Sequence, residues 1–199
     1  MTTTLFLIRH VPHIHQGRVH VGRMPDVPLA EGWPERFAKL GARMGPERLD
    51  AVYASPILRA QLTAGAVAEA AGVEVRTLEG LTEIDAGEWT GRAFADFADS
   101  PERQAWDSAR AFNRTPGGEN LLEVQHRMMA AVDQIRAAHP EGRVAVVSHG
   151  DPLKTVLLYV LGLPIDAYDK IEIDPGSVST AVVGPWGAKM LRLNEPVIE

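Results

Sequence analysis

Three short apolar runs, each followed directly by polar residues, constrain the fold of this 199-residue chain more than any other feature. They extend from Leu5 to Ile8, from Ala51 to Tyr53 and from Val144 to Val147. Continuous apolar runs of this length are typical of strands that are buried on both faces of a parallel sheet. The pattern therefore predicts an α/β fold.

The residues that follow these runs are of types that take part in chemistry. Parallel strands end at one edge of the sheet, where loops and helix N-termini converge and where ligands bind in open α/β folds. We therefore expect one site that contains the polar residues after each run, namely Arg9, His10, Ser55, Arg59, Ser148, His149 and Gly150.

Helices are predicted between these strands by apolar spacing and by residues suited to helix ends. Two are expected over residues 28–44 and 119–138. Two more are expected to begin with a cap residue followed by proline and to end at glycine. The first begins at Ser55-Pro56 and ends at Gly72, and the second begins at Asp151-Pro152 and ends at Gly162. Arg59 then lies in a first helical turn, which is a natural anion site.

The C-terminal part of the chain and the segment before the helix expected over residues 119–138 complete the predicted fold. Between Phe94 and Arg110 a shorter helical stretch is expected to cover the site. After Gly162 the pattern alternates in "KIEID", "SVSTAVV" and "KMLRL", with "GPWG" as a turn, which predicts strands that form an antiparallel edge. That edge would either pair with a second subunit, giving a homodimer, or be covered by its own chain. We expect one domain over residues 1–199.

Composition narrows the classes of partner. The formal net charge is -6 and no Lys/Arg cluster occurs, which argues against nucleic acid or an anionic membrane as the partner. The absence of cysteine excludes disulfides and thiolate metal sites and suits a reducing compartment. The first apolar run is too short for a signal peptide or a membrane span, so we expect a cytoplasmic protein.

Two arginines, two histidines and a carboxylate together make a set of groups for phosphoryl transfer. A phosphoryl group carries about two negative charges, which arginine forks neutralise with two hydrogen bonds each. An unprotonated histidine nitrogen can attack phosphorus, and an acid can protonate the leaving oxygen. Each residue alone has an ordinary interpretation as a solvated or strand-end residue, but the group as a whole is specific: Arg9, His10, Arg59, Glu83 and His149.

The sequence resembles the histidine phosphatase superfamily, in its phosphoglycerate mutase-like branch. The resemblance extends from about Thr4 to about Leu161 and is carried by "LFLIRH", "VYASPILRAQLTA", "LTEIDAGEWTG", "PGGENLLEVQHR" and "VAVVSHGDPLK". It implies a three-layer α/β/α sandwich and a small phosphorylated metabolite as substrate. It also implies that neither a metal nor an organic cofactor is used.

The resemblance also implies roles for individual residues. His10 would be transiently phosphorylated, and Glu83 would protonate the leaving oxygen and later activate water, which requires a raised pKa for its carboxyl group. The phosphoryl oxygens would be held by Arg9, Arg59 and His149.

Two residues after the nucleophile depart from the family pattern. Val11 stands where the family usually has glycine or alanine, and Pro12 stands where a polar residue is common. A β-branched residue before proline favours extended geometry, and proline has no N–H to donate. We predict a negative φ at Val11 and a loop with one backbone donor fewer for phosphate.

Further substrate contacts are expected from the loop that follows. Gln16 stands where many relatives have a phosphate-binding asparagine, and Gly22 matches a segment near the substrate. His13 is expected at the rim of the pocket, with His15 and His20 solvated, since no carboxylate pair or cysteine nearby completes a zinc site. Arg23 would add positive charge at the mouth of the pocket. Gly150 is also expected to bind the substrate.

Three functions remain open at this point. A short lid segment between Glu88 and the phosphatase-like "PGGEN" favours a phosphomonoesterase. The second candidate is a phosphoglycerate-type phosphomutase, which would need a bisphosphate primer. The third is a catalytically retired protein that only binds a phosphorylated ligand, and its sole support is Val11-Pro12.

Overall fold

The computed structural model describes residues 1–197, and its strands form a six-stranded sheet in the order β3-β2-β4-β1-β5-β6. The strand that begins the chain lies near the middle, pairs in parallel with β4 and pairs antiparallel with β5. The expected mostly parallel sheet with an antiparallel edge is thus confirmed. The strands are β1 (Thr3–Arg9), β2 (Ala51–Ala54), β3 (Val75–Thr77), β4 (Arg143–Ser148), β5 (Val178–Gly184) and β6 (Gly187–Glu195).

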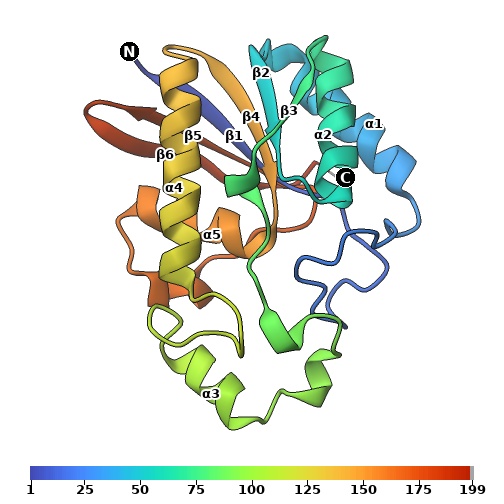
Figure 1. Cartoon of the computed structure of the whole chain (residues 1–199). Helices are drawn as coiled ribbons and strands as arrows, with labels where there is room; N and C mark the ends of the chain where they lie inside the picture. Colours follow the sequence, from blue (N-terminus) through green and yellow to red (C-terminus); the bar gives the residue numbers. More distant parts are fainter. Residues whose placement is uncertain (198–199) are drawn as a thin grey trace.

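Helices cover both faces of this sheet. The α-helices are α1 (Trp33–Met44), α2 (Leu58–Ala71), α3 (Pro101–Ser108), α4 (Leu121–Ala138) and α5 (Gly150–Leu161). Short 3-10 helices are η1 (Gly45–Glu47), η2 (Glu79–Leu81), η3 (Gly87–Trp89), η4 (Phe94–Asp96) and η5 (Ile165–Lys170). In Figure 1, α1 and α2 lie on one side of the sheet, α4 and α5 on the other, and α3 lies beyond its lower end.

Strand β1 shows how the two layers are filled. Its Leu5 and Leu7 belong to the core cluster that includes residues of α4 and α5, whereas Phe6 and Ile8 belong to the cluster that includes residues of α1 and α2. Successive side chains of a strand point to opposite faces, so an unbroken apolar run is what a central strand of this sheet requires. The three-layer α/β/α sandwich is confirmed.

The predicted starts of three helices were wrong. Helix α1 begins at Trp33, five residues late, because the preceding segment pairs with the loop after β1 and Gly32 has a left-handed φ of 79°. Helix α2 begins at Leu58 because Ser55 still continues the sheet, its N–H donating to the carbonyl of Val147. Helix α5 begins at Gly150, with His149 as N-cap.

The C-terminal prediction was right for two of three strands. The segment "KIEID" is not a strand: η5 ends at Lys170, and residues 171–174 carry no strand assignment. Ile171 and Ile173 are buried instead as part of the core beside α5. The expected hairpin is present, with Pro185 and Trp186 as the turn between β5 and β6. No helix within residues 1–197 is long and apolar enough to cross a membrane.

Candidate active site

His10 lies directly after β1 and is only 2% exposed. Its Nδ1 lies 2.7 Å from the carbonyl oxygen of Val11, which can only accept, so Nδ1 carries the proton. Its Nε2 lies 3.2 Å from Nε of Arg59, which can only donate. Burial and the charge of Arg59 lower the pKa of His10 well below its usual value. The imidazole is therefore neutral, with the lone pair on Nε2.

Two arginines supply fixed charge around His10. Arg59, in the first turn of α2, is 1% exposed and is held by the carbonyls of Gly22 at 2.7 Å and Met24 at 3.2 Å. Arg9 donates through its Nη1 to the carbonyl of Ile173 at 2.7 Å. Its buried Nε has no hydrogen-bond partner among the described residues. A buried cationic donor of this kind is suited to an anionic ligand.

His149 faces His10 from the end of β4, with the two ring centroids 5.1 Å apart. Its Nε2 lies 2.7 Å from Oγ of Ser55, and that oxygen also accepts from the N–H of Ile57. In the tautomer in which the Ser55 hydroxyl donates to Nε2, the proton of His149 is on Nδ1. This Nδ1 is buried, lies 4.0 Å from Oε2 of Glu83 and makes no hydrogen bond within residues 1–197.

Glu83 supplies the carboxyl group of the site. Burial, together with the negative charge of Asp151, raises the pKa of Glu83 to about 7. One carboxyl oxygen accepts the N–H of Ile84 at 2.9 Å. A carboxyl group with this pKa can give up and regain a proton near neutral pH.

The loop that carries Glu83 is held by an ion pair between Glu119, from "PGGEN", and Arg127 of α4. Arg127 donates to the carbonyls of Gly80, Thr82 and Glu83 at 2.7–3.1 Å. Its Nε lies 3.0 Å from Oε1 of Glu119, whose other oxygen accepts the N–H of Asp85 at 2.8 Å. The pair thus fixes the main chain on which the Glu83 side chain is mounted.

The loop after His10 has the geometry expected of Val11-Pro12. Val11 is absent from the non-glycine residues with positive φ in the described chain, so the predicted negative φ is confirmed. Its N–H donates to Oγ1 of Thr63 at 3.2 Å, and the carbonyl of Pro12 accepts from Ala30 at 2.9 Å. Neither residue keeps an N–H for a ligand. Thr63 had not been recognised from the sequence.

These groups open into a cavity of about 340 Å³. Among its walls are His13, Gln16, Gly22 and Gly150, as well as His20, which had been expected to be solvated. Arg23 is not one of its lining residues, which corrects the expectation for it. Its guanidinium lies 3.0 Å from the carboxylate of Glu119 and donates to the carbonyl of Glu83 at 2.9 Å, so its charge is compensated there.

His13 is 6% exposed, and its ring centroid lies 5.8 Å from that of His10. Its Nδ1 accepts the N–H of His15 at 3.2 Å, so in the neutral ring the proton is on Nε2. Burial lowers the pKa of His13 to about 4, and the positive charges of Arg59 and Arg9 act in the same direction. In the part of the chain that the structure describes, no group of three or more His, Asp or Glu side chains is arranged to hold a metal.

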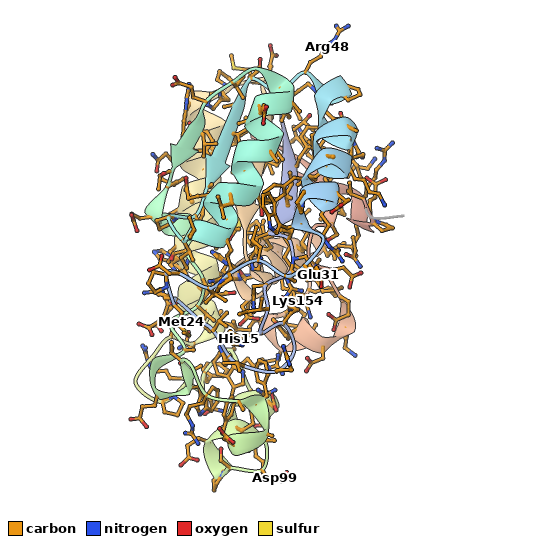
Figure 2. The ribbon with its side chains drawn as sticks, turned by 90° about the vertical axis from the view of Figure 1, so that its right-hand side faces the viewer. His15, Met24, Glu31, Arg48, Asp99 and Lys154 are labelled. Atoms are coloured by element: carbon orange, nitrogen blue, oxygen red, sulfur yellow. The ribbon has the colours of Figure 1, made fainter. Side chains whose placement is uncertain are left out.

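The outer wall of the cavity comes from the lid, α5 and η5. Its lining residues include Arg103, Trp106, Arg110, Asp151, Lys154 and Tyr168. The charged residues of this wall were not predicted from the sequence, although Asp151 and Lys154 lie in the motif "GDPLK". Figure 2 shows Lys154 between the upper half of the molecule and the lid, at whose far end Asp99 lies.

Three aromatic side chains of the lid, Phe97, Trp106 and Phe112, have different positions. Trp106 lines the cavity and meets Trp89 edge to face, with centroids 6.2 Å apart. Phe97 is buried, with its ring stacked on Trp89 at 4.8 Å, whereas Phe112 is 78% exposed. Trp89 thus links the lid to the segment that carries Glu83.

Comparisons with known proteins bear on this arrangement. A family model described as "Histidine phosphatase superfamily (branch 1)" matches residues 5–196. Phosphoserine phosphatase 1 of Hydrogenobacter thermophilus is 28% identical over 192 residues, which are 96% of this chain and 91% of that protein. The bifunctional protein Rv2228c of Mycobacterium tuberculosis is 31% identical over 194 residues, and the match spans 96% of this chain and 53% of that protein.

Among solved structures, the mycobacterial glucosyl-3-phosphoglycerate phosphatase Rv2419c superposes with a TM-score of 0.88 at 22% identity. That superposition covers 98% of this chain and 100% of the other.

Proposed function

The chain belongs to the histidine phosphatase superfamily, whose general mechanism passes through a phosphohistidine, and we propose that it is a phosphomonoesterase with His10 as its nucleophile. The observation that carries this proposal is the unprotonated Nε2 of His10, held 3.2 Å from a buried arginine in the wall of the cavity. A neutral imidazole surrounded by fixed cations is suited to attack on an anionic phosphoryl group.

In the first step the lone pair of His10 Nε2 forms a bond to phosphorus while the bond from phosphorus to the ester oxygen breaks. Protonated Glu83 gives its proton to the departing alkoxide, which leaves as an alcohol. Arg9, Arg59 and the Nδ1–H of His149 donate to the phosphoryl oxygens. The buried Nε of Arg9 and Nδ1 of His149, neither of which has a hydrogen-bond partner within residues 1–197, are the donors free for this role.

In the second step ionised Glu83 takes a proton from water, and the water oxygen attacks phosphorus. The bond between phosphorus and Nε2 breaks, which releases phosphate and restores neutral His10. Because Glu83 has a pKa of about 7, its carboxyl group can serve as acid in one step and base in the next.

His13 and Gln16 take the place of the backbone donors that Val11 and Pro12 do not supply. The Nε2–H of neutral His13 is available to a phosphoryl or ester oxygen, since Nδ1 already accepts from His15. Gln16 lines the same cavity, and the NH2 group of its side-chain amide can donate to a phosphoryl oxygen.

The two arginines supply the positive charge that a metal ion would otherwise provide. We therefore propose that the reaction needs neither a metal nor an organic cofactor. We also propose that it takes place in the cytoplasm, because a chain without cysteine suits a reducing compartment. Phosphate release should be the same with and without a chelator. A loss of activity on chelation that added metal restores would contradict this part of the proposal.

The test of the main proposal is brief incubation with a labelled phosphomonoester. We expect an acid-labile phosphoprotein and steady phosphate release from the wild type, and neither from His10→Ala. His126→Ala is the matched control, because His126 is exposed on α4. Label that forms without phosphate release would indicate a mutase, and binding without label would indicate a retired enzyme.

A further inference from the structure

Two cations far from His10 in the sequence share one aromatic ring in the outer wall of the cavity. Cζ of Arg110 and Nζ of Lys154 each lie 4.2 Å from the centroid of the Tyr168 ring. We call Arg110 and Lys154 the outer cation pair. Both line the same cavity as His10. The ring fixes their positions, since a cation over an aromatic face is attracted by the ring quadrupole.

The outer cation pair is buried, whereas the acids that face it at the cavity rim are exposed. Arg110 is 8% exposed and Lys154 5%. Asp169, 3.3 Å from Arg110, has a side chain that is 70% exposed, and Glu172, 3.2 Å from Lys154, one that is 75% exposed. Ion pairs with solvated partners contribute little energy, so these acids compensate the buried charges only weakly.

Arg110 has a buried donor without a hydrogen-bond partner in residues 1–197. Its Nη2 lies 2.6 Å from Oδ1 of Asp107, in addition to the contact with Asp169. Its Nε is buried and, among the described residues, has no hydrogen-bond partner. A buried guanidinium N–H without an acceptor is costly, and a ligand oxygen would remove that cost.

A chain of contacts connects the outer cation pair to the reacting groups. The Tyr168 hydroxyl donates to the carboxylate of Asp151, in the first turn of α5 directly after Gly150. Asp151 is close enough to Glu83 to contribute to the raised pKa of that carboxyl group. A cavity of about 340 Å³ is at the small end of the range for metabolite sites. Because His10, Arg110 and Lys154 line this one cavity, a small phosphoester bound in it lies among all three.

We propose that the outer cation pair binds a carboxylate of the substrate, so that the preferred substrates are phosphate monoesters of small hydroxy acids. This inference rests on the proposed function and adds to it the chemical class of the leaving alcohol. The carboxylate takes the place of the exposed Asp169 and Glu172 and accepts from Nε of Arg110 and from Nζ of Lys154. Asp151 stays bound to Tyr168 and does not compete for these donors.

The test compares two esters that differ only at the far end. In 3-phosphoglycerate and glycerol 3-phosphate the phosphoryl group is on the same primary oxygen, and a carboxylate in the first replaces a hydroxymethyl group in the second. We expect kcat/KM to be at least about tenfold higher for 3-phosphoglycerate, as one charge-assisted hydrogen bond implies. The difference should lie mainly in KM.

Arg110→Gln and Lys154→Met should each reduce this ratio of kcat/KM values about tenfold or more. Two variants are used so that a folding defect in one does not decide the result. Arg114→Gln and Lys189→Met are matched controls, because both residues are exposed and neither lines the cavity. They should leave the ratio unchanged.

A ratio of kcat/KM values near one in the wild type would overturn the inference. A preference for phosphoethanolamine over 3-phosphoglycerate would also overturn it, because it would mean that the acids of the outer wall bind an ammonium group. Hydrolysis of an aryl phosphate through labelled His10 reports on the proposed function separately. If no ester is hydrolysed, calorimetry on His10→Ala still tests the inference, which requires 3-phosphoglycerate to bind about tenfold tighter than glycerol 3-phosphate.

Discussion

Nε of Arg59 lies 3.2 Å from Nε2 of His10, and this contact determines which nitrogen of the imidazole is free of a proton. A guanidinium has no acceptor, so Nε2 must present its lone pair to it. The same arginine is anchored to the carbonyls of Gly22 and Met24. Arg59 therefore connects the first turn of α2 to the loop after β1, and it also sets the tautomer of His10.

Arg59→Lys should lower kcat/KM for any phosphomonoester by roughly 10²- to 10³-fold, because lysine cannot reproduce the planar fork of donors. Arg114→Lys, at an exposed position, should be neutral. Steady-state kinetics on purified variants with matched thermal unfolding midpoints measures the effect. A loss below fivefold would mean that Arg59 does not contact the phosphoryl group in the transition state.

Glu83→Gln should slow alkyl phosphates by at least about tenfold more than aryl phosphates, since an aryl oxide leaves without needing a proton. The measurement is kcat/KM for a matched series of esters that differ in the pKa of the alcohol. Equal losses across the series would count against Glu83 as the proton donor.

The dependence of kcat/KM on pH should follow the carboxyl group of Glu83. Its pKa is raised to about 7, so the donor form is present below pH 7 and is lost as pH rises through that value. Activity on an alkyl ester, corrected for ionisation of the substrate, should therefore fall above about pH 7. The lowered pKa of His10 keeps the nucleophile neutral down to below pH 6.5. Glu83→Gln should abolish the fall, and its persistence there would assign it to another group.

Thr63→Val should destabilise the fold by about 1–3 kcal/mol, because the buried N–H of Val11 would lose its acceptor. Thr63 also donates to the carbonyl of Arg59 at 2.8 Å, so the variant should in addition raise KM. Thr63→Ser keeps the hydroxyl and is the control. Urea unfolding compares the three proteins, and equal stability of Thr63→Val and wild type would contradict the assignment.

Gly87→Ala should be strongly destabilising, by more than about 2 kcal/mol. Gly87 has a φ of +52°, and an added Cβ would lie 2.0 Å from the carbonyl oxygen of Pro116, where the turn before α4 packs against η3. In contrast, a Cβ at Gly65, within α2, meets nothing within 4 Å. Gly65→Ala should stabilise by about 0.5–1 kcal/mol through helix propensity. In thermal unfolding, the midpoint temperature should be highest for Gly65→Ala, intermediate for the wild type and lowest for Gly87→Ala.

Much of the site was predictable because its residues follow buried strands. An apolar run marks a central strand whatever covers it, and a parallel sheet brings the ends of such runs to one edge. The positions of His10 after β1 and His149 after β4 follow from that rule alone, whereas Arg59 was placed in the first turn of α2 by the residues suited to the ends of that helix. So does the negative φ of Val11, which is a local property of a β-branched residue before proline.

The predictions were wrong where polar side chains bind residues that are distant in the sequence. Ser55 and Asp151 were expected to cap helices, but Ser55 bonds to His149, 94 positions away, and Asp151 to Tyr168, 17 positions away. Arg23 was expected to add positive charge at the mouth of the pocket, but its guanidinium lies 3.0 Å from the carboxylate of Glu119, which compensates that charge.

The sequence by itself determined the three central parallel strands, the C-terminal hairpin, the covering helices apart from their exact starts, and the principal polar residues at the carboxyl edge of the sheet, because those depend on apolar periodicity and local backbone preferences. Only the tertiary structure decided which nitrogen of His10 carries a proton, which charges are compensated, and that Arg110 and Lys154 share the cavity of His10. Hydrogen bonds and ion pairs depend on contact in space, and separation along the chain does not encode that contact.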